Sequence, residues 1–335
     1  MYCQIEEKET INIKEWNDYT ICHSGNPTQL YEYGNLYCGN SSPIYLTIYD
    51  NSLKVLQWLL CCHKKSILCF VSAESEPSYE NEKYITHAID YICQIYKPFM
   101  FNFYSISLSR FQDIDLLSSL KFDSIFEYES NQIDLTLSDD ELFKDIHSKH
   151  RNVIRKAEKS NVHIFEGYSK NDLEKYYQLS QETYKRSNGK NFTYQALIKY
   201  VENLKKTGNI RIFFAEADNK IQAAAIILIT SKLAIYWHGA SCNNTSAGIS
   251  NYLHWQIIKK LKEEFVEKYD FGGLSINPDK GSKSEGINRF KKRFGGIVGK
   301  YYGGIMLRNK LIYEIFNLYN LAKKELVNLL LFIKR

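Results

Sequence analysis

The stretch IRIFFAEADNKIQAAAIILITSKLAIYWHG, residues 210–239, contains three apolar segments separated by short polar turns. β-Branched and aromatic residues dominate them, which predicts three strands: Ile210–Ala217, Ile221–Thr230 and Leu233–Gly239. Because the turns are tight, these strands are expected to be antiparallel neighbours. A helix over residues 250–266 and a short strand over 269–271 follow, and a helix between two strands implies a crossover to a parallel neighbour. The stretch therefore predicts a mixed α/β fold.

The sequence on either side extends the same domain. Ser138-Asp139-Asp140-Glu141 is a capping box, with Ser at the N-cap and Glu three residues later, and it predicts a helix to about Ser160. Periodicity predicts the remaining elements: a strand at 162–165, helices at 170–186 and 193–206, a basic helix after the glycine-rich loop, a strand at 298–307 and an amphipathic helix at 309–334.

The first part of the chain repeats the order of strands, helix and strand. We expect strands at 43–49, 53–60 and 66–71, a helix at 78–96, a strand at 99–108, a helix near 111–120 and strands at 125–128 and 133–137. Single cores rarely grow beyond roughly 250–300 residues, so a chain of 335 residues predicts more than one domain. The predicted organisation is a first domain over 1–137, a second over 138–308, and a C-terminal helix over 309–335.

Composition narrows the class of protein. Apolar residues make up 44% of the chain and the net charge is only +5. The eight cysteines show neither a C-x-x-C pair nor the Cys/His spacing of a zinc site, which favours free thiols in a reducing cytosol and no metal. The N-terminus lacks the basic and apolar regions of a signal peptide, and the longest apolar runs, 223–229 and 329–333, are far shorter than the roughly 20 residues that span a bilayer. We expect a cytoplasmic protein, soluble or peripheral at the inner face of the membrane.

A dense basic stretch covers residues 147–159. Arg151 and Arg155 are four residues apart and share one face of the predicted helix. They predict a phosphate-binding surface for a nucleotide or RNA. The alternative is an ordinary solvated helix face.

Two further residues are candidates for substrate binding. Arg186 lies at the end of a predicted helix, from which it can reach into the space between helices; the alternative is a cation that complements the helix dipole. His238 ends a predicted strand and is either a base or a strand-end core histidine. The following loop, residues 242–250, keeps only the small residues of the Gln/Arg-x-x-Gly-x-Gly/Ala pattern that acetyl-CoA enzymes use.

Two segments follow that are rich in glycine. Tyr269-Asp270-Phe271-Gly272-Gly273 places a diglycine after a short strand, where the backbone can approach a ligand closely. The segment from Gly286 to Gly296 reads GINRFKKRFGG. Phe290 and Phe294 are four residues apart and are expected to pack on the core, which turns Lys291 off that face.

Together with SKHRNVIRKA at residues 148–157, these segments resemble the FemABX peptidyltransferases and their FemAB-like (CelD-like) relatives of the GNAT acyltransferase superfamily. The resemblance covers about residues 138–304 and implies two tandem GNAT-like domains, the first degenerate. It also implies transfer of an amino acid from aminoacyl-tRNA to an amine of a peptidoglycan precursor. The lysine of the Phe-Lys pair lies near the acyl ester in that family, and an arginine at the place of Arg186 lies near the precursor phosphates.

The chemistry implied is direct aminolysis, in which an amine attacks an activated ester or thioester. Lys291 is the candidate for stabilising the oxyanion, and Tyr236 and Asp270 are candidate proton carriers. Asp270 has an alternative interpretation as a strand-end residue that binds backbone amides. Gly272, Gly273 and Phe290 are candidates for contact with the substrate.

The donor and the acceptor stay open at this point. No permanently bound cofactor is expected; the donor is acetyl-CoA or another acyl-CoA, favoured by the absence of the long tRNA-binding insertion, or aminoacyl-tRNA, favoured by the degraded phosphate loop. Expected partners are a nucleotide- or lipid-linked envelope precursor, the acceptor end of a tRNA, and the membrane through the C-terminal helix. The alternative function is a non-enzymatic protein that binds RNA or a membrane surface.

Overall fold

The computed structural model describes residues 1–38, 41–103, 118, 120, 122–187 and 191–314. The first half contains β1 (Tyr2–Glu6), α1 (Ile13–His23), the 3-10 helix η1 (Pro27–Gln29), α2 (Tyr31–Tyr37), β2 (Ser42–Asp50), β3 (Leu53–Lys65), β4 (Leu68–Ala73), β5 (Ser78–Tyr79), α3 (Lys83–Tyr96), β6 (Met100–Phe103) and β7 (Ser124–Asp134). The second half contains α5 (Asp139–Asp145), α6 (Ser148–Lys159), β8 (His163–Glu166), α7 (Lys170–Ser187), α8 (Tyr194–Lys206), β9 (Ile210–Ala217), β10 (Lys220–Ile229), β11 (Leu233–Ser241), α9 (Ile249–Glu263), β12 (Lys268–Leu274), α10 (Lys283–Lys292) and β13 (Ile297–Leu307).

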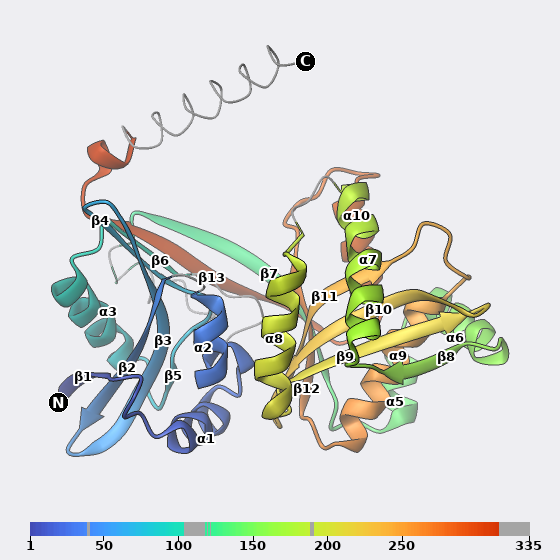
Figure 1. Cartoon of the computed structure of the whole chain (residues 1–335), viewed down its shortest axis with the longest axis horizontal. Coiled ribbons are helices and arrows are strands. Elements are labelled where there is room, and N and C mark those ends of the chain that lie inside the picture. The colour runs from blue at the N-terminus through green and yellow to red at the C-terminus, as the bar shows by residue number, and fades with distance from the viewer. Residues whose placement is uncertain (39–40, 104–117, 119, 121, 188–190, 315–335) are drawn as a thin grey trace, which may run out of the picture.

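The described strands form one continuous sheet that runs across both halves (Figure 1). Its order is β1-β2-β3-β4-β6-β13-β7-β12-β11-β10-β9-β8, with β5 paired to β3. In the first half β2, β3 and β4 are antiparallel and β6 is parallel to β4; in the second half β9, β10 and β11 are antiparallel and β12 is parallel to β11. The two halves are therefore structural copies, and the expected tandem GNAT-like α/β architecture is confirmed.

The copies exchange their last strands. β7 ends the first half but pairs with β12, and β13 ends the second half but pairs with β6. The two exchanged strands also pair with each other, at the centre of the sheet. The predicted boundary after residue 137 thus lies between copies that share strands, and the independence of 1–137 and 138–308 stays a prediction.

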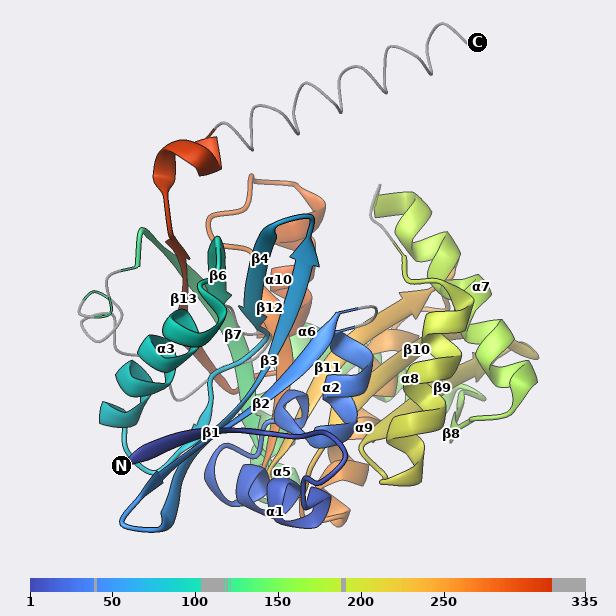
Figure 2. The same cartoon turned by 60° about the vertical axis from the view of Figure 1, so that its left-hand side comes forward.

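Helices cover both faces of the sheet (Figure 1, Figure 2). α3 packs on β2 and β3, and α9 packs on β9 and β10. On the other face α1 and α2 contact β3, α7 and α8 contact the strands of the second half, and α2 contacts α8. One buried cluster contains Trp16 and Tyr45 from the first half with Tyr176 and Phe214 from the second. The apolar core is therefore continuous between the halves.

Tertiary partners change two of the predicted elements. Strands expected at 125–128 and 133–137 are one strand, β7, because the polar residues between them have buried partners: Ser130 donates to Asp270, and Asn131 donates to the carbonyl oxygens of Lys291 and Gly295. The helix expected over 138–160 is divided into α5 and α6 at residues 146–147, whose backbone is extended. The capping box at its start is confirmed.

Other predicted boundaries shift by a few residues. The helix expected from residue 78 starts at Lys83, because Ser78 and Tyr79 pair with β3 instead. The strand at 269–271 extends to Leu274 and includes the diglycine. Residues 111–117 and 315–335, which hold most of a predicted short helix and of the C-terminal helix, lie outside the described residues; residues 310–314 are helical.

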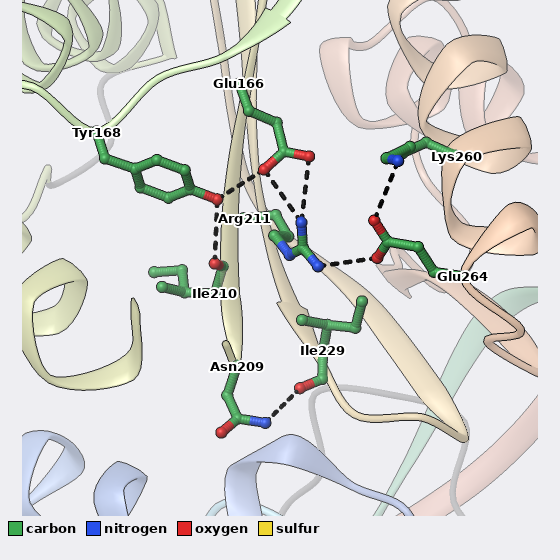
Figure 3. Close-up of polar contacts among 8 residues, drawn as sticks. All are labelled: Glu166, Tyr168, Asn209, Ile210, Arg211, Ile229, Lys260 and Glu264. Atoms are coloured by element: carbon green, nitrogen blue, oxygen red, sulfur yellow. Dashed lines mark hydrogen bonds and ion pairs between the residues drawn. The ribbon is translucent and has the colours of Figure 1, made fainter. Parts of the chain in front are cut away.

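An ion-pair network fastens the edge of the second half (Figure 3). Arg211 on β9 lies 3.3 Å from a carboxylate oxygen of Glu166 and 2.9 Å from one of Glu264. The hydroxyl of Tyr168 also donates to Glu166, and Lys260 lies 3.4 Å from Glu264. The network joins β8, β9 and the end of α9. Among the described residues, the helices are too short or too polar to cross a bilayer.

Candidate active site

The site is built where two parallel strands separate. β11 and β12 pair only from Leu233 to Ile235, opposite Lys268 to Asp270; beyond this β11 continues to Ser241 and β12 to Leu274 without pairing to each other. In the first half, by contrast, β4 stays paired with β6 to its last residue. Among the residues that the structure describes, the parallel strands thus separate in the second copy, whereas β4 and β6 of the first stay paired as far as Ala73 and Phe103.

A β-bulge on each strand accompanies this separation. On β11, His238 and Tyr236 face consecutive residues of β10, so Trp237 has no partner there. On β12, Asp270 and Gly273 face Gln132 and Ser130, so the two residues between them oppose one residue of β7. A bulge bends its strand and re-aims the neighbouring side chains. Both bulges follow directly after the last paired residues and turn the two strands apart.

Asp270 fixes the bulge on β12. Its side chain is fully buried and accepts hydrogen bonds from the Ser130 hydroxyl, from the Gly272 amide at 2.7 Å and from the Gln132 amide group at 3.2 Å. Gly272 has a φ of +70°, which favours glycine. The hydrogen bond from the Gly272 amide agrees with the alternative interpretation of Asp270, a strand-end residue that binds backbone amides. A role in proton transfer stays a prediction.

Lys291 reaches the same bulge from α10. Its ammonium group donates to the carbonyl oxygen of Gly273 at 2.8 Å and lies 6.0 Å from the centre of the Tyr236 ring. Burial lowers the pKa of Lys291 to about 8, while the Asp270 carboxylate acts in the opposite direction. The structure thus brings Lys291, Tyr236, Asp270 and Gly273 together.

Tyr236 occupies space that a glycine leaves open. A Cβ atom added to Gly239 would lie 1.6 Å from the Tyr236 hydroxyl oxygen. The ring packs edge-on against His254 of α9, with centroids 4.5 Å apart. Burial raises the pKa of Tyr236 far above its ordinary value, so the hydroxyl stays protonated and can donate a hydrogen bond.

The sequence offered no signal for His254, because a histidine between Leu253 and Trp255 on an apolar helix resembles a core residue. It is buried, lies 2.9 Å from the Tyr269 hydroxyl through Nδ1, and contacts Phe290 and Phe294. Burial lowers its pKa to about 3, so the ring is neutral. Phe290, a predicted substrate contact, is half-buried in this aromatic group.

His238 lies on the other side of β11. Its Nδ1 atom is 3.0 Å from the Tyr184 hydroxyl of α7, and its ring contacts Phe192 and Trp237. Burial lowers the pKa of His238 to about 4. The bulge at Trp237 turns His238 toward α7, whereas Tyr236 faces α9. The structure therefore does not bring His238 to Lys291.

Arg186 closes the far side of the opening. Its guanidinium donates to the carbonyl oxygens of Ser241 and Cys242 and to the Asn243 side chain, which fastens the end of β11 to α7. The guanidinium also donates to the hydroxyls of Thr183 and Ser241, so these hydrogen bonds go to neutral oxygens. Burial, and then the charge of Arg186, lower the pKa of Lys283 at the start of α10. Cations from two different helices are therefore close enough here for their charges to interact.

The predicted arginines of α6 both have partners within the chain. Arg151 donates to the carbonyl oxygens of Lys144 and Ile146 and so completes the end of α5. Arg155 lies 5.2 Å from the centre of the Phe143 ring. Their role in substrate binding stays a prediction.

His150, which the sequence did not single out, connects α6 to α10. Its Nε2 atom lies 3.1 Å from the carbonyl oxygen of Phe290, and its ring packs edge-on against Phe294. Because a carbonyl oxygen only accepts, Nε2 carries the proton. The basic helix α6 is thereby held against the helix that carries Lys291.

Comparisons with known proteins cover the same region. Residues 147–292 match a family model described as an acetyltransferase (GNAT) domain. The lipid II:glycine glycyltransferase of Staphylococcus haemolyticus is 25% identical over 120 residues, which are 35% of this chain and 29% of that protein. The protein of that name from Staphylococcus saprophyticus is 30% identical over 95 residues, 28% of this chain and 23% of that protein. The match thus spans less than a third of these relatives.

Solved structures match over nearly the whole chain. FemX has a TM-score of 0.77 at 15% identity and covers 94% of this chain and 99% of its own. A tandem GNAT protein from the clavulanic acid biosynthesis pathway has a TM-score of 0.53 at 8% identity, covering 92% and 98%. At these identities the likeness concerns the fold. Residues 147–292 are thus similar to GNAT acetyltransferase domains, and the fold of the whole chain resembles that of FemX.

Proposed function

We propose that this protein transfers an aminoacyl or acyl group to an amine of a cell-envelope precursor by direct aminolysis. The observation that carries the proposal is the meeting of Lys291, Tyr236 and Asp270 at the opening between β11 and β12. A GNAT domain spans these strands and α10. This match also disfavours the alternative of a non-enzymatic binding protein.

The reaction needs an ester carbonyl beside Lys291. As the amine attacks, a C–N bond forms, the ester C–O bond breaks, and one amine proton passes to the leaving oxygen. Negative charge develops on the carbonyl oxygen of the ester. The ammonium group of Lys291 stabilises this oxyanion when it donates its hydrogen bond to the oxyanion in place of the Gly273 carbonyl. The neutral Tyr236 hydroxyl supplies a second donor. Asp270 holds the Gly272–Gly273 backbone in place.

The contacts at α9 favour aminoacyl-tRNA over acyl-CoA as the donor. An acyl-CoA pyrophosphate would be expected at the N-terminus of α9. There the carbonyl oxygen of Val153 lies only 2.6 Å from the place of a Cβ on Gly248, so α6 packs directly on this terminus. A carbonyl dipole opposes a phosphate. The basic helices α6 and α10 instead offer cations to a polynucleotide.

The names of the sequence relatives and the positive charge near the opening support a phosphate-bearing envelope precursor as the acceptor. The two Staphylococcus proteins are named for lipid II, a lipid-linked precursor. Arg186 and Lys283 supply positive charge on the two sides of the opening, where the phosphates of a nucleotide- or lipid-linked precursor would lie. A lipid-linked acceptor would place the protein at the inner face of the membrane. Residues 315–335 of the proposed membrane helix lie outside the described residues.

A donor exchange assay tests the proposal. The protein is incubated with aminoacyl-tRNA or with acetyl-CoA, each labelled in the acyl group, and with lipid-linked or nucleotide-linked muropeptide acceptors. We expect the acceptor to gain label from tRNA. Lys291→Ala should reduce transfer at least a hundredfold, whereas Lys292→Ala, on an exposed lysine that pairs with Glu129, should not. Label transfer from neither donor would refute the proposed chemistry.

A further inference from the structure

The hairpin between β3 and β4 exposes an apolar side chain between charges. Ile67 is 94% exposed, and Lys64 and Lys65 directly precede the turn. Ser66 at the turn has a φ of +56°. A single exposed apolar residue needs no explanation. Its significance depends on what surrounds it.

Two other segments adjoin this hairpin through Phe99. The Phe99 amide donates to the carbonyl oxygen of Cys69 at 2.7 Å, and its own carbonyl accepts from the Arg308 amide. Its ring lies 6.4 Å from that of Tyr313. The start of β4 next to the hairpin turn, the end of α3 and the segment after β13 are therefore neighbours.

These segments expose further apolar side chains: Ile95 at 52%, Leu311 at 65% and Ile312 at 47%. Cations lie among them: Lys64, Lys65, Lys97, Arg308 and Lys310. Residues 64–68, 95–97 and 308–314, which we call the hairpin–helix surface, contain one acidic residue, Glu314. Lys310 pairs with Asp123 just outside it. The surface thus combines exposed aliphatic groups with an excess of positive charge.

The hairpin–helix surface lies at the end of the molecule at which α10 and its preceding loop also project (Figure 1, Figure 2). That loop exposes Ile276 and Lys280. The β2–β3 hairpin, by contrast, turns at the opposite end (Figure 1). The upper side of the protein in both views therefore presents apolar and cationic groups from both halves, although Figure 1 shows α10 well separated from the hairpin–helix surface along the horizontal axis.

We infer that the hairpin–helix surface docks on a bilayer of anionic phospholipid. Aliphatic side chains enter the boundary between headgroups and acyl chains, while neighbouring lysine and arginine side chains contact lipid phosphates. RNA would match the cations but would leave Ile67 and Leu311 in water, which favours the lipid. Only the purpose of docking, access to a lipid-linked acceptor, depends on the proposed function.

Flotation of the full chain with vesicles tests this inference without any acceptor. We expect binding to phosphatidylglycerol-containing vesicles and little binding to pure phosphatidylcholine. Ile67→Asp should weaken the partition coefficient on the order of tenfold, and Lys64→Glu several-fold. The matched controls are Leu53→Asp, on the exposed tip of the opposite hairpin, and Lys220→Glu, on an exposed hairpin of the second half; neither should change it.

Three results would overturn the inference: no binding to anionic vesicles, equal losses in the control variants, or displacement of the protein from vesicles by RNA through the same residues. Transfer to a soluble nucleotide-linked acceptor is measured in parallel. Ile67→Asp should keep that activity, which shows that the variant is folded. Vesicle binding without any transfer would refute the proposed chemistry alone, and transfer without vesicle binding would refute docking alone.

Discussion

The Lys291 side chain is half-buried, and its ammonium group lies against the backbone of β12. Its bond to the Gly273 carbonyl and the nearby Asp270 carboxylate offset part of the cost of burial. The pKa of about 8 nevertheless leaves most of the group protonated at neutral pH. A partly desolvated cation of this kind suits the stabilisation of an oxyanion.

We expect transfer to decline as the pH rises through about 8, because Lys291 loses its proton there. Lys291→Arg, if active, should remove this decline, since a guanidinium stays protonated. Asp270→Asn should move the decline to lower pH, because the carboxylate raises the pKa of Lys291. The measurement is kcat/KM from pH 6 to pH 10, with acceptor amine held saturating or corrected for its own titration. An unchanged decline in Lys291→Arg would assign it to another group.

The same titration predicts an effect on stability with the opposite sense. The pKa of Lys291 is about 8 in the folded protein and about 10.4 in an unfolded chain. Between these values the unfolded state binds more protons, so the free energy of unfolding should rise with pH. Urea unfolding at pH 7.5 and pH 10 measures this for the wild type and Lys291→Met. If the free energy of unfolding rises as much in Lys291→Met as in the wild type, groups other than Lys291 cause the rise.

At the scale of residues, sequence patterns located most of the candidate site. Lys291, Tyr236, Asp270 and Gly273 were named from motifs and meet in the structure. His238 was named too, but a bulge, which leaves no mark in a strand's alternation, turns it to the other face.

The turn before β13 decides how α10 and β13 are joined. Gly295 and Gly296 have φ values of +81° and +82°. A Cβ on Gly296 would lie 2.4 Å from the Gln132 carbonyl oxygen, and the Gly296 amide donates to Asp145. The turn thus ties α10 to the end of α5 and to β7.

Gly296→Ala should therefore destabilise the protein by at least about 2 kcal/mol, from backbone strain and contact with β7. Gly286→Ala is the matched control: it lies inside α10, and an added Cβ meets nothing within 4 Å. That variant should gain about 0.5–1 kcal/mol. Chemical denaturation measures both. Equal effects of the two substitutions would contradict the role of the turn.

The ion pairs that Arg211 makes with Glu166 and Glu264 should stabilise the edge of the second half. Arg211→Met leaves the carboxylates of Glu166 and Glu264 half-buried without their cation, which should cost about 1–3 kcal/mol at neutral pH. Lys170→Met, which removes an exposed pair at 3.9 Å, should cost at most about 0.5 kcal/mol. Urea unfolding at neutral pH compares the two variants with the wild type, and equal costs would contradict the role of the network.

Strands and helices with strong periodicity were predictable, and β9, β10 and β11 agree closely with expectation. The continuity of β7 was not predictable, because the polar side chains in its middle form hydrogen bonds with Asp270 and with the end of α10. Such partners lie more than a hundred residues away and leave no local pattern.

On the scale of the whole molecule, the strand exchange makes the two copies depend on each other. Without the first half, β12 loses β7 and β13 loses both of its neighbours. Element order predicted the copies, but it could not predict the exchange, because pairing between distant strands has no sequence period.

The full chain should therefore unfold in one cooperative transition despite its length. Residues 138–308 alone should show no cooperative transition, because β12 and β13 would have open edges. Circular dichroism and calorimetry of both proteins measure this. A sharp melt of the isolated segment would instead support the boundary that the sequence predicts.

The exchange also sets an order of events during synthesis. β6 and β7 leave the ribosome early, but the strand that fills the space between them, β13, is made near the end of the described chain. Until then two strand edges remain open to wrong partners. Lys291 emerges only just before the closing strand. The candidate site is thus completed last, and the nascent protein is exposed to aggregation from the synthesis of β7 until that of β13.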